Sequence, residues 1–277
     1  MALIELKNVS KSFGRLVVLD GLDLSIEAGQ SLVVIGASGT GKSVLLKHIV
    51  GLLKPDDGEV WFDAQRVDLM PERQLMELRT RFGFLFQMGA LFDSLTVGEN
   101  IAFPLQEHTD KPPQEIARVV SERLEMVGLP GIERKMPAQL SGGQRKRVAL
   151  ARAIALEPQV ILYDEPTTGL DPVRSDVINR LILKLNNELH VTSITVTHDM
   201  ASAFKVADRI VMLHEGKIIF DGTADQIRRT EVPLVRQFVR GEATESELEA
   251  LDEAETHRKQ IERAEEEAEQ EAAGGNR

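Results

Sequence analysis

The chain has no cysteine, and nowhere in its 277 residues does an apolar run approach the roughly 20 residues that a helix needs to cross a bilayer. Without cysteine no disulfide can form, which fits a reducing compartment. The first 14 residues, MALIELKNVSKSFG, include Glu5 and no long apolar stretch, so they lack the pattern of a signal peptide. We therefore expect a soluble cytoplasmic protein.

The chain also lacks a basic region. Residues 241–277 carry 13 acidic and four basic side chains, which leaves only −2 of the net charge of −11 for residues 1–240. Neither segment has the excess of Lys and Arg that nucleic-acid binding needs, so we expect no nucleic-acid partner. We interpret residues 1–240 as one domain and the Glu- and Ala-rich residues 241–277 as a solvated acidic tail, partly helical or disordered.

The order of apolar segments predicts an α/β fold. Two β-rich segments, 2–9 and 15–26, flank a turn at 12–14. Strands then alternate with helices, which predicts a parallel sheet covered on both faces. The expected strands are 31–35, 82–86, 160–163 and 191–196, the helices are 43–53 and 173–189, and 210–213 with 217–220 form a terminal hairpin. Residues 95–157 look mainly helical, and we interpret 88–158 as an inserted lobe.

Residues 36–43, GASGTGKS, match the phosphate-loop pattern G-x-x-x-x-G-K-[ST]. Glycines let backbone N–H groups turn toward phosphate oxygens, and the following helix presents its positive end to them. Lys42 would bridge the β- and γ-phosphates of ATP, and the Ser43 hydroxyl would ligate Mg²⁺. A chance match is expected on the order of once per hundred such chains, and the position between a buried strand and a helix favours a phosphate site over a simple turn. The candidate binding residues are Gly36, Ser38, Gly39, Gly41, Lys42 and Ser43.

Two adjacent carboxylates follow the strand 160–163. An apolar strand that ends in Asp164 delivers a carboxylate to the edge of the sheet where Mg²⁺ would bind. Glu165 is then placed to orient or activate a water molecule for attack on the γ-phosphate. The alternative is a turn that merely ends the strand, and the phosphate loop argues against it.

A phosphate loop alone leaves kinases, GTPases, helicases and other ATPases open. Residues 140–144, LSGGQ, distinguish among them, because Ser141 is a good N-cap for the helix predicted at 145–156, whose free N–H groups suit an anion. This turn, about twenty residues before Asp164, resembles the signature sequence of ABC ATPases. The resemblance implies that Ser141, Gly142, Gly143 and Gln144 contact nucleotide.

Further landmarks of ABC ATPases follow in register over residues 1–222. The resemblance implies that Phe13 stacks on adenine, that Gln87 senses Mg²⁺ and the attacking water, and that His198 contacts the γ-phosphate. Asp171 lies in the segment that resembles the loop crossing between subunits. Taken singly, Phe13 could be a core residue, Gln87 a strand cap and His198 a surface histidine. Together they imply a P-loop NTPase fold with a RecA-like core, an antiparallel β subdomain and an inserted α-helical subdomain.

The chain has one phosphate loop and one signature turn, which in this family face different ATP molecules. The resemblance therefore implies a homodimer with two composite sites, both competent because Glu165 and residues 140–144 show no degeneration. ATP binding would close the dimer and hydrolysis would release it. This cycle would drive a permease through a groove beside Gln87, lined by residues 88–95 and the helical lobe.

Residues 84–92, FLFQMGALF, and residues 95–105 resemble the ATPases of Mla/MCE-type lipid transporters, as does the segment 235–238. This resemblance implies phospholipid transport between the inner and outer membranes of a bacterium, with the ATPase peripheral on the cytoplasmic face of the inner membrane. It implies a permease and a periplasmic MCE lipid-binding subunit as partners. The small cytoplasmic regulatory subunit of some such systems would rely on the region after Phe238, where the acidic extension departs from the pattern.

Two other classes stay open at this point. The first is the ATPase of a small-solute importer, such as one for polar amino acids, with the same chemistry on another permease. The second is a non-transport ABC protein acting on ribosomes or DNA, but the sequence has no second cassette, coiled-coil insertion or zinc site. A GTPase is excluded because no Asn-Lys-x-Asp motif occurs.

Overall fold

The computed structural model describes residues 2–242, so the predicted tail from residue 243 onward lies outside the described residues. The chain divides into two compact units, residues 1–229 and 230–277. The described part of the second unit contains one helix, α9 (Pro233–Arg240), which begins at a proline and ends before Gly241 in a left-handed conformation, with φ of 67°. The remaining elements belong to the first unit.

An antiparallel sheet opens the first unit. Its strands are β1 (Ala2–Phe13), β2 (Leu16–Glu27), β4 (Asp57–Phe62) and β5 (Gln65–Arg66), in the order β2-β1-β4-β5. The predicted turn at 12–14 is wrong in its position, because Phe13 still pairs with Leu16 and the chain reverses at Gly14 and Arg15. β4 and β5 were not predicted.

A second sheet carries the elements that end near the phosphate loop. Its strands are β3 (Ser31–Ile35), β6 (Phe82–Leu85), β7 (Val160–Asp164), β8 (Thr192–Thr197), β9 (Arg209–His214) and β10 (Lys217–Gly222), in the order β10-β9-β3-β8-β7-β6. All neighbouring strands are parallel except the β9–β10 hairpin. The predicted parallel sheet and its terminal hairpin are confirmed.

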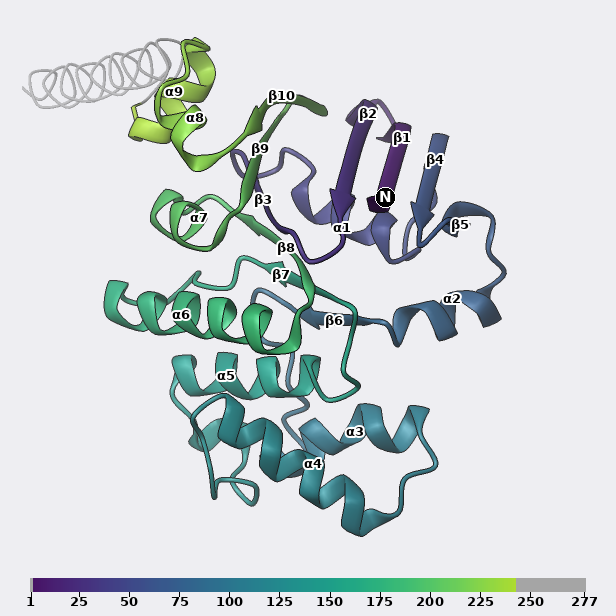
Figure 1. Cartoon of the computed structure of the whole chain (residues 1–277), viewed down its shortest axis with the longest axis vertical. Helices are drawn as coiled ribbons and strands as arrows, with labels where there is room; N and C mark the ends of the chain where they lie inside the picture. Colours follow the sequence, from purple (N-terminus) through teal and green to yellow (C-terminus); the bar gives the residue numbers. More distant parts are fainter. Residues whose placement is uncertain (1, 243–277) are drawn as a thin grey trace, which may run out of the picture. The chain divides into compact units, whose positions relative to one another are not determined.

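Helices cover these sheets (Figure 1). They are α1 (Lys42–Ile49), the 3-10 turn η1 (Val67–Leu69), α2 (Glu72–Arg79), α6 (Pro172–Leu189), α7 (Met200–Val206) and α8 (Ala224–Arg228). α1 packs against β4, whereas α7 packs against β3 and β8. The prediction that the first helix reaches residue 53 is wrong. Gly51 adopts a φ of 65°, and the amides of Leu52 and Leu53 turn back to the Lys47 carbonyl, which ends the helix at Ile49.

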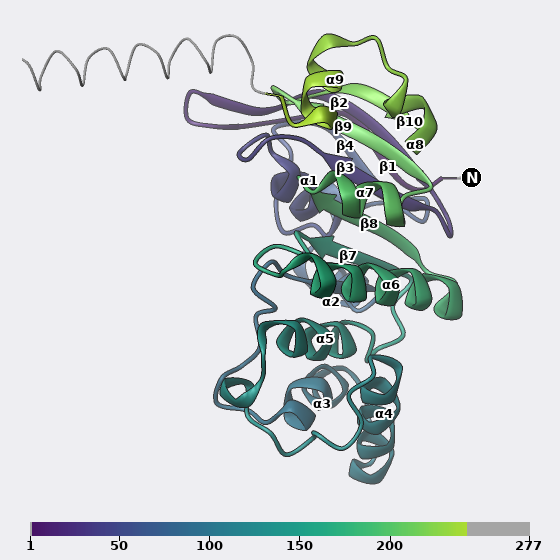
Figure 2. The same cartoon turned by 90° about the vertical axis from the view of Figure 1, so that its left-hand side faces the viewer.

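The segment predicted to be an inserted lobe, residues 88–158, contains α3 (Val97–His108), α4 (Pro113–Met126), the 3-10 turn η2 (Pro137–Gln139) and α5 (Gly142–Ala153). Figures 1 and 2 show these helices at the end of the unit opposite the antiparallel sheet, with α5 between α6 and the α3–α4 pair. α5 also packs against β6, so it connects the lobe to the parallel sheet. It begins at Gly142, three residues earlier than predicted, because Ser141 caps it.

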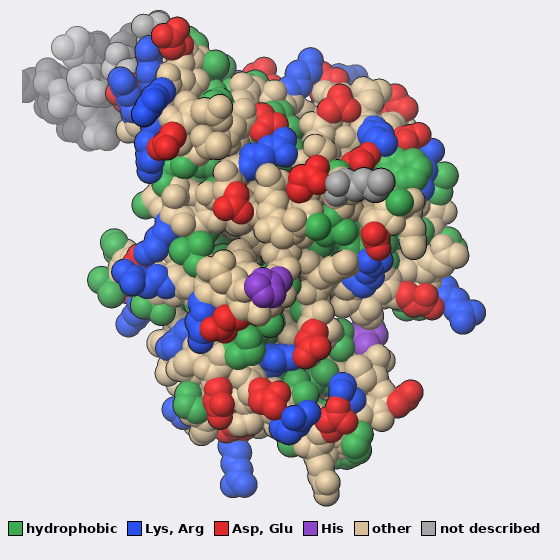
Figure 3. All heavy atoms as spheres, in the orientation of Figure 1, with side chains coloured by type: hydrophobic (Ala, Val, Ile, Leu, Met, Phe, Trp, Pro, Cys, Tyr) green, Lys and Arg blue, Asp and Glu red, His purple; other side chains and the backbone are tan. Residues whose placement is uncertain are grey.

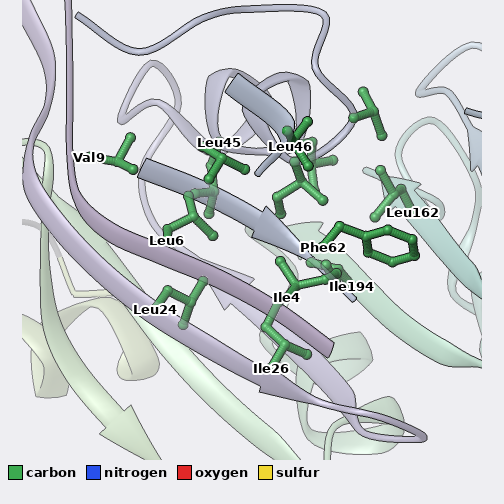
Figure 4. Close-up of a cluster of buried hydrophobic side chains, with 14 of the residues drawn as sticks. Ile4, Leu6, Val9, Leu24, Ile26, Leu45, Leu46, Phe62, Leu162 and Ile194 are labelled. Carbon is green, nitrogen blue, oxygen red and sulfur yellow. The ribbon is translucent and has the colours of Figure 1, made fainter. Parts of the chain in front are cut away.

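One buried cluster joins the two sheets to α1 (Figure 4). Leu6 of β1 lies next to Leu45 of α1, and Ile4 of β1 lies near Phe62 of β4. Ile4, Leu6, Leu45 and Leu46 are almost fully buried. Burial of each such side chain contributes about 1.5–3 kcal/mol, so the helix that follows the phosphate loop is held firmly. The other labelled members of this cluster are Val9, Leu24, Ile26, Phe62, Leu162 and Ile194.

The surface is polar and mixed in charge. Figure 3 shows acidic and basic side chains interleaved over the helical lobe. Among the described residues, no helix combines the length and apolar character that crossing a membrane requires.

Candidate nucleotide-binding site

A cavity of about 350 Å³ opens where β3 and β7 end and α1 begins. It gathers ten of the predicted site residues from segments far apart in the sequence. Its lining consists of Phe13, Val18, Ser38, Gly39, Gly41, Lys42, Ser43, Val44, Gln87, Asp164, Glu165 and His198. Ligand sites at the carboxyl ends of parallel strands are a general property of α/β sheets.

The phosphate loop is shaped by glycine. Gly41 has a φ of 97°, and a Cβ atom there would lie 2.8 Å from Val18 Cγ1 and 2.9 Å from the Val18 carbonyl oxygen. Only glycine can bring the loop this close to β2 in that conformation. Gly41 also caps α1 without a side chain, which leaves the N–H groups of the first helical turn open to an anion.

Lys42 is nearly buried and turns back over the loop. Its ammonium donates hydrogen bonds to the carbonyl oxygens of Gly36 and Ala37, both at 2.8 Å. Burial lowers the pKa of Lys42, and the nearby carboxylates of Glu165 and Asp164 oppose that shift. The amine is therefore held at the loop that we expect to bind phosphates.

Two side-chain oxygens of the kind that ligate hard cations, Ser43 Oγ and Asp164 Oδ1, lie close together in the cavity. Ser43 Oγ donates to Asp164 Oδ1 at 3.3 Å, and Gln87 lines the same cavity. Burial raises the pKa of Asp164, an effect partly offset by the Ser43 hydrogen bond. The described residues contain no group of three or more acidic, His or Cys side chains that would hold a metal alone. This donor set fits Mg²⁺, which uses one or two protein oxygens and completes its shell with phosphates and water.

Glu165 is held at both its backbone and its carboxylate. Its φ of 49° is left-handed, a conformation that costs a non-glycine residue about 1–2 kcal/mol, and its N–H donates to the Val196 carbonyl at 2.9 Å. Thr168 Oγ1 donates to the carboxylate at 3.0 Å, and His198 Nδ1 lies 2.9 Å from Glu165 Oε1. The Glu165 side chain is 12% exposed and lines the cavity from a constrained position.

Phe13 stands at the end of β1 with 48% of its surface exposed. It lines the cavity and does not join the core. Lys11 Nζ lies 5.7 Å from the centroid of the Phe13 ring, and the exposed ring can stack on a planar group.

The remaining predicted residues lie outside this cavity. Ser141 Oγ accepts the Gln144 amide at 3.3 Å and Gln144 Oε1 accepts the Ser141 amide at 3.0 Å, which closes a capping box at the start of α5. Asp171 caps α6 by accepting the Arg174 amide at 3.0 Å. Six predicted residues are absent from the lining of the cavity: Gly36, Ser141, Gly142, Gly143, Gln144 and Asp171.

Sequence reasoning missed several side chains that hold Glu165. Thr168 and Thr197 donate to its carboxylate, the latter at 3.4 Å. Lys146 is 6% exposed and donates to the Glu165 carbonyl at 3.2 Å and to the Gln87 carbonyl. The one available signal was the position of Lys146, four residues before the apolar Leu150 and so on the same face of a helix.

Comparison with known protein families finds one family model that covers the residues of the cavity from the phosphate loop to Glu165. A family model described as ABC transporter matches residues 19–168, more than half of the chain. This match contains the phosphate loop, the signature turn and both carboxylates.

Curated relatives match most of the chain. The intermembrane phospholipid transport system ATP-binding protein MlaF of Haemophilus influenzae is 44% identical over 241 residues, which are 87% of this chain and 91% of that protein. MlaF of Escherichia coli is 41% identical over 86% of this chain and 89% of its own length. A probable ribonucleotide transport ATP-binding protein, mkl of Mycobacterium leprae, is 44% identical over 86% of this chain and 69% of its own length.

Solved structures share the fold. The ATP-binding cassette MJ0796, in a dimeric post-hydrolysis state bound to ADP and Pi, has a TM-score of 0.73 and 36% identity, covering 79% of this chain and 98% of that one. The cbiO1 subunit of Clostridium perfringens, part of the transporter complex cbiONQ, has a TM-score of 0.75 and 30% identity, covering 86% and 97%.

Proposed function

The chain belongs to the ATP-binding family of ABC transporters and is an ATPase whose hydrolysis is coupled to transport; from this premise we propose that it powers phospholipid transport between the inner and outer membranes of a bacterium. The observation that carries the proposal is the identity of 44% and 41% with two proteins named for intermembrane phospholipid transport, over nearly nine-tenths of the chain. The relative named for ribonucleotide transport is equally similar and supplies the competing cargo.

In this proposal the cavity binds ATP with Mg²⁺. Phe13 stacks on the adenine, and the backbone N–H groups of residues 36–43 surround the phosphates. Lys42 exchanges its two carbonyl partners for the β- and γ-phosphates. Ser43, Asp164 and Gln87 hold Mg²⁺, which when bound neutralises charge on the β- and γ-phosphate oxygens.

Hydrolysis needs a water molecule aligned with the γ-phosphate. Glu165 accepts a hydrogen bond from this water and takes its proton as the oxygen bonds to phosphorus and the bond to the β-phosphate oxygen breaks. Thr168, Thr197 and His198 fix the carboxylate so that one orientation is populated. His198, which is more exposed than Glu165, contacts the γ-phosphate.

The position of the signature turn supports a homodimer with composite sites. Residues 141–144 and Asp171 do not line the cavity of their own chain. In this dimer the N–H groups of Gly142 and Gly143, which the capping box of Ser141 and Gln144 does not use, bind the nucleotide held by a second copy, with Asp171 beside the contact between the copies. The dimeric MJ0796 cassettes among the structural relatives support this arrangement.

A second cavity supports contact with a permease. This docking groove, of about 430 Å³, is lined in part by Phe86, Phe92 and Phe103, which are all partly exposed. Met88, next to Gln87, is 86% exposed. We place the ATPase at the cytoplasmic face of the inner membrane, bound through this groove to a permease that works with a periplasmic lipid-binding subunit.

The test is purification of the tagged protein from its native membranes, followed by mass spectrometry of proteins and lipids. We expect a permease, a periplasmic lipid-binding subunit and bound phospholipid. Phe92→Glu should abolish recovery of the permease, because it introduces a charge into the apolar lining of the docking groove. Leu69→Glu, at an exposed apolar residue that does not line the groove, is the matched control.

Each outcome has a meaning. A permease recovered with ribonucleotide and no lipid would replace the cargo by that of the mycobacterial relative. A permease with a solute-binding protein would indicate a small-solute importer. Recovery of no membrane protein would contradict the proposal, and equal loss in both variants would show that the docking groove is not the contact.

A further inference from the structure

Helix α5 begins at the signature turn and carries a buried lysine on the face that contacts the parallel sheet. Lys146 lies a little over one turn after Ser141, and only 6% of its surface is exposed. Its ammonium donates to the carbonyl oxygen of Gln87, which follows β6, and to that of Glu165, which follows β7, the latter at 3.2 Å. One side chain thus connects the signature helix with two residues of the nucleotide cavity.

These contacts give a buried lysine a role at a position where an apolar residue would otherwise pack. Burial lowers the pKa of Lys146, while the carboxylates of Glu165 and Asp164 act in the opposite direction. Within the described residues no ion pair is found for Lys146. Its hydrogen-bond partners are two backbone carbonyls, so the desolvated amine holds the main chain at Gln87 and Glu165 in place.

The backbone at Glu165 needs such support. Its left-handed φ of 49° persists only when surrounding contacts determine it. The Val196 carbonyl accepts the Glu165 N–H, and Lys146 holds the carbonyl on the other side of the residue. The peptide groups on both sides of the carboxylate are therefore fixed, one by β8 and one by α5.

The same helix holds the segment after Gln87 at a second point. Arg152 donates to the carbonyls of Gly89 and Ala90 at 2.9 and 2.7 Å, about two turns beyond Lys146. The segment from Gln87 to Ala90 is thus attached to α5 along its length. A displacement of α5 must move this segment and Glu165 together.

We propose that Lys146 is a positioning residue for ATP hydrolysis, which sets the geometry of Glu165 and Gln87 according to the position of the signature helix. Nucleotide contact at the start of α5 is then transmitted within the subunit to the carboxylate of its own cavity. This inference rests on the proposed role of Glu165 in activating water. Lys146 does not touch the phosphate loop, so it acts on the rate of hydrolysis and not on the affinity for ATP.

The test compares Lys146→Met, Lys146→Gln and Lys146→Arg with the wild-type full chain. kcat is measured by phosphate release, the Kd for ATP by calorimetry, and the melting temperature by scanning calorimetry. Lys146→Met retains an unbranched side chain but loses the donors, and we expect kcat to fall about 10- to 100-fold because misplaced catalytic groups carry costs of that size. The Kd for ATP should stay within about twofold, since the phosphate loop is intact.

Rescue and a matched control separate positioning from packing. Gln and Arg retain N–H donors, so at least one of them should recover kcat several-fold over Met. Lys184→Met removes an exposed lysine that donates to the Met126 carbonyl at 3.3 Å on the surface of α6, and kcat and Kd should be unchanged.

Three results would overturn the proposal. The first is a wild-type kcat in Lys146→Met; the second is a parallel loss of kcat, ATP affinity and melting temperature, which would assign Lys146 to the fold. The third is a loss of kcat that neither donor variant recovers. If Lys146→Met does not fold, Lys146→Gln is judged by the first two criteria. Glu165→Gln, measured alongside, separates the two hypotheses, because its activity tests the role of Glu165 without involving Lys146.

Discussion

At the scale of single residues, the cavity contains residues whose conformation or burial lowers the free energy of unfolding of the protein. Glu165 has a left-handed backbone and Lys42 a desolvated amine. Both are retained where phosphates and water are expected to bind, and strained or desolvated groups cluster at functional sites.

We expect Glu165→Gln to lower kcat by at least about 100-fold, because an amide cannot take the proton of the attacking water. The affinity for ATP should change little, since the side chain keeps its shape. With Mg²⁺ and ATP the variant should accumulate as a dimer, measured by light scattering after gel filtration. Glu188→Gln, at an exposed position on α6, is the control. Turnover near the wild-type rate would disprove the role of Glu165.

Lys42→Ala should weaken ATP binding about 10- to 100-fold, since each hydrogen bond to a charged group contributes about 1.5–3 kcal/mol. Calorimetric titration with ATP measures this change. Lys47→Ala, at an exposed lysine one turn further along α1, should bind ATP with nearly wild-type affinity. Equal affinity in the two variants would count against the phosphate loop as the binding element.

At the scale of elements, the site depends on the close approach of β6 to α5. A Cβ atom on Gly83 would lie 2.4 Å from the carbonyl oxygen of Ala153, at the end of α5. Because the Ala153 carbonyl belongs to the backbone of α5, it cannot rotate away from an added Cβ atom as a flexible side chain could. Glycine at this point of β6 therefore sets the distance between the strand that leads to Gln87 and the helix that carries Lys146.

Gly83→Ala should destabilise the protein by about 1–3 kcal/mol through overpacking. It should also lower kcat, because β6 and α5 separate and the contacts of Lys146 lengthen. Thermal unfolding and phosphate release measure the two effects. Gly98→Ala in α3, whose Cβ would lie 3.2 Å from the Glu133 carbonyl oxygen, should change stability by no more than about 1 kcal/mol. Equal behaviour of the two variants would mean that the β6–α5 distance is not critical.

At the scale of the whole molecule, the fold keeps the signature turn away from the phosphate loop of the same chain. α5 stands between α6 and the α3–α4 pair, while the phosphate loop joins β3 to α1 (Figures 1 and 2). A complete site then requires a second copy, as we propose.

Mixing two inactive variants tests this composite site. Lys42→Ala disables the phosphate loop, and Gly143→Asp places a carboxylate where the helix start would face phosphate; a Cβ atom there has room, with its nearest neighbour 3.7 Å away. Each variant alone has two defective sites. A mixed dimer has one doubly defective and one intact site, so an equal mixture should regain up to about a quarter of the wild-type activity. No recovery in dimers shown to exchange subunits would contradict composite sites.

Much of this protein followed from local sequence. The phosphate loop, the strand that ends in Asp164 and the capped turn at Ser141 each depend on a few neighbouring residues, so their patterns were visible in the chain. The family was recognisable for the same reason. Tail residues from 243 onward lie outside the described structure, and their predicted character remains a prediction.

Other features could be decided only by the tertiary structure. β4 was missed because its pairing with β1 connects segments about 50 residues apart, and the two-residue β5 was missed because it pairs only with β4. The partners of Lys146 lie 59 and 19 residues away, and the threonine that joins Thr168 on Glu165 lies 32 residues away. Sequence alone determined which chemical groups the chain has and indicated most of its helices and strands, although not all of their bounds. Folding decided which of those groups meet, because contacts between distant segments depend on how the sheets and helices pack and not on local preference.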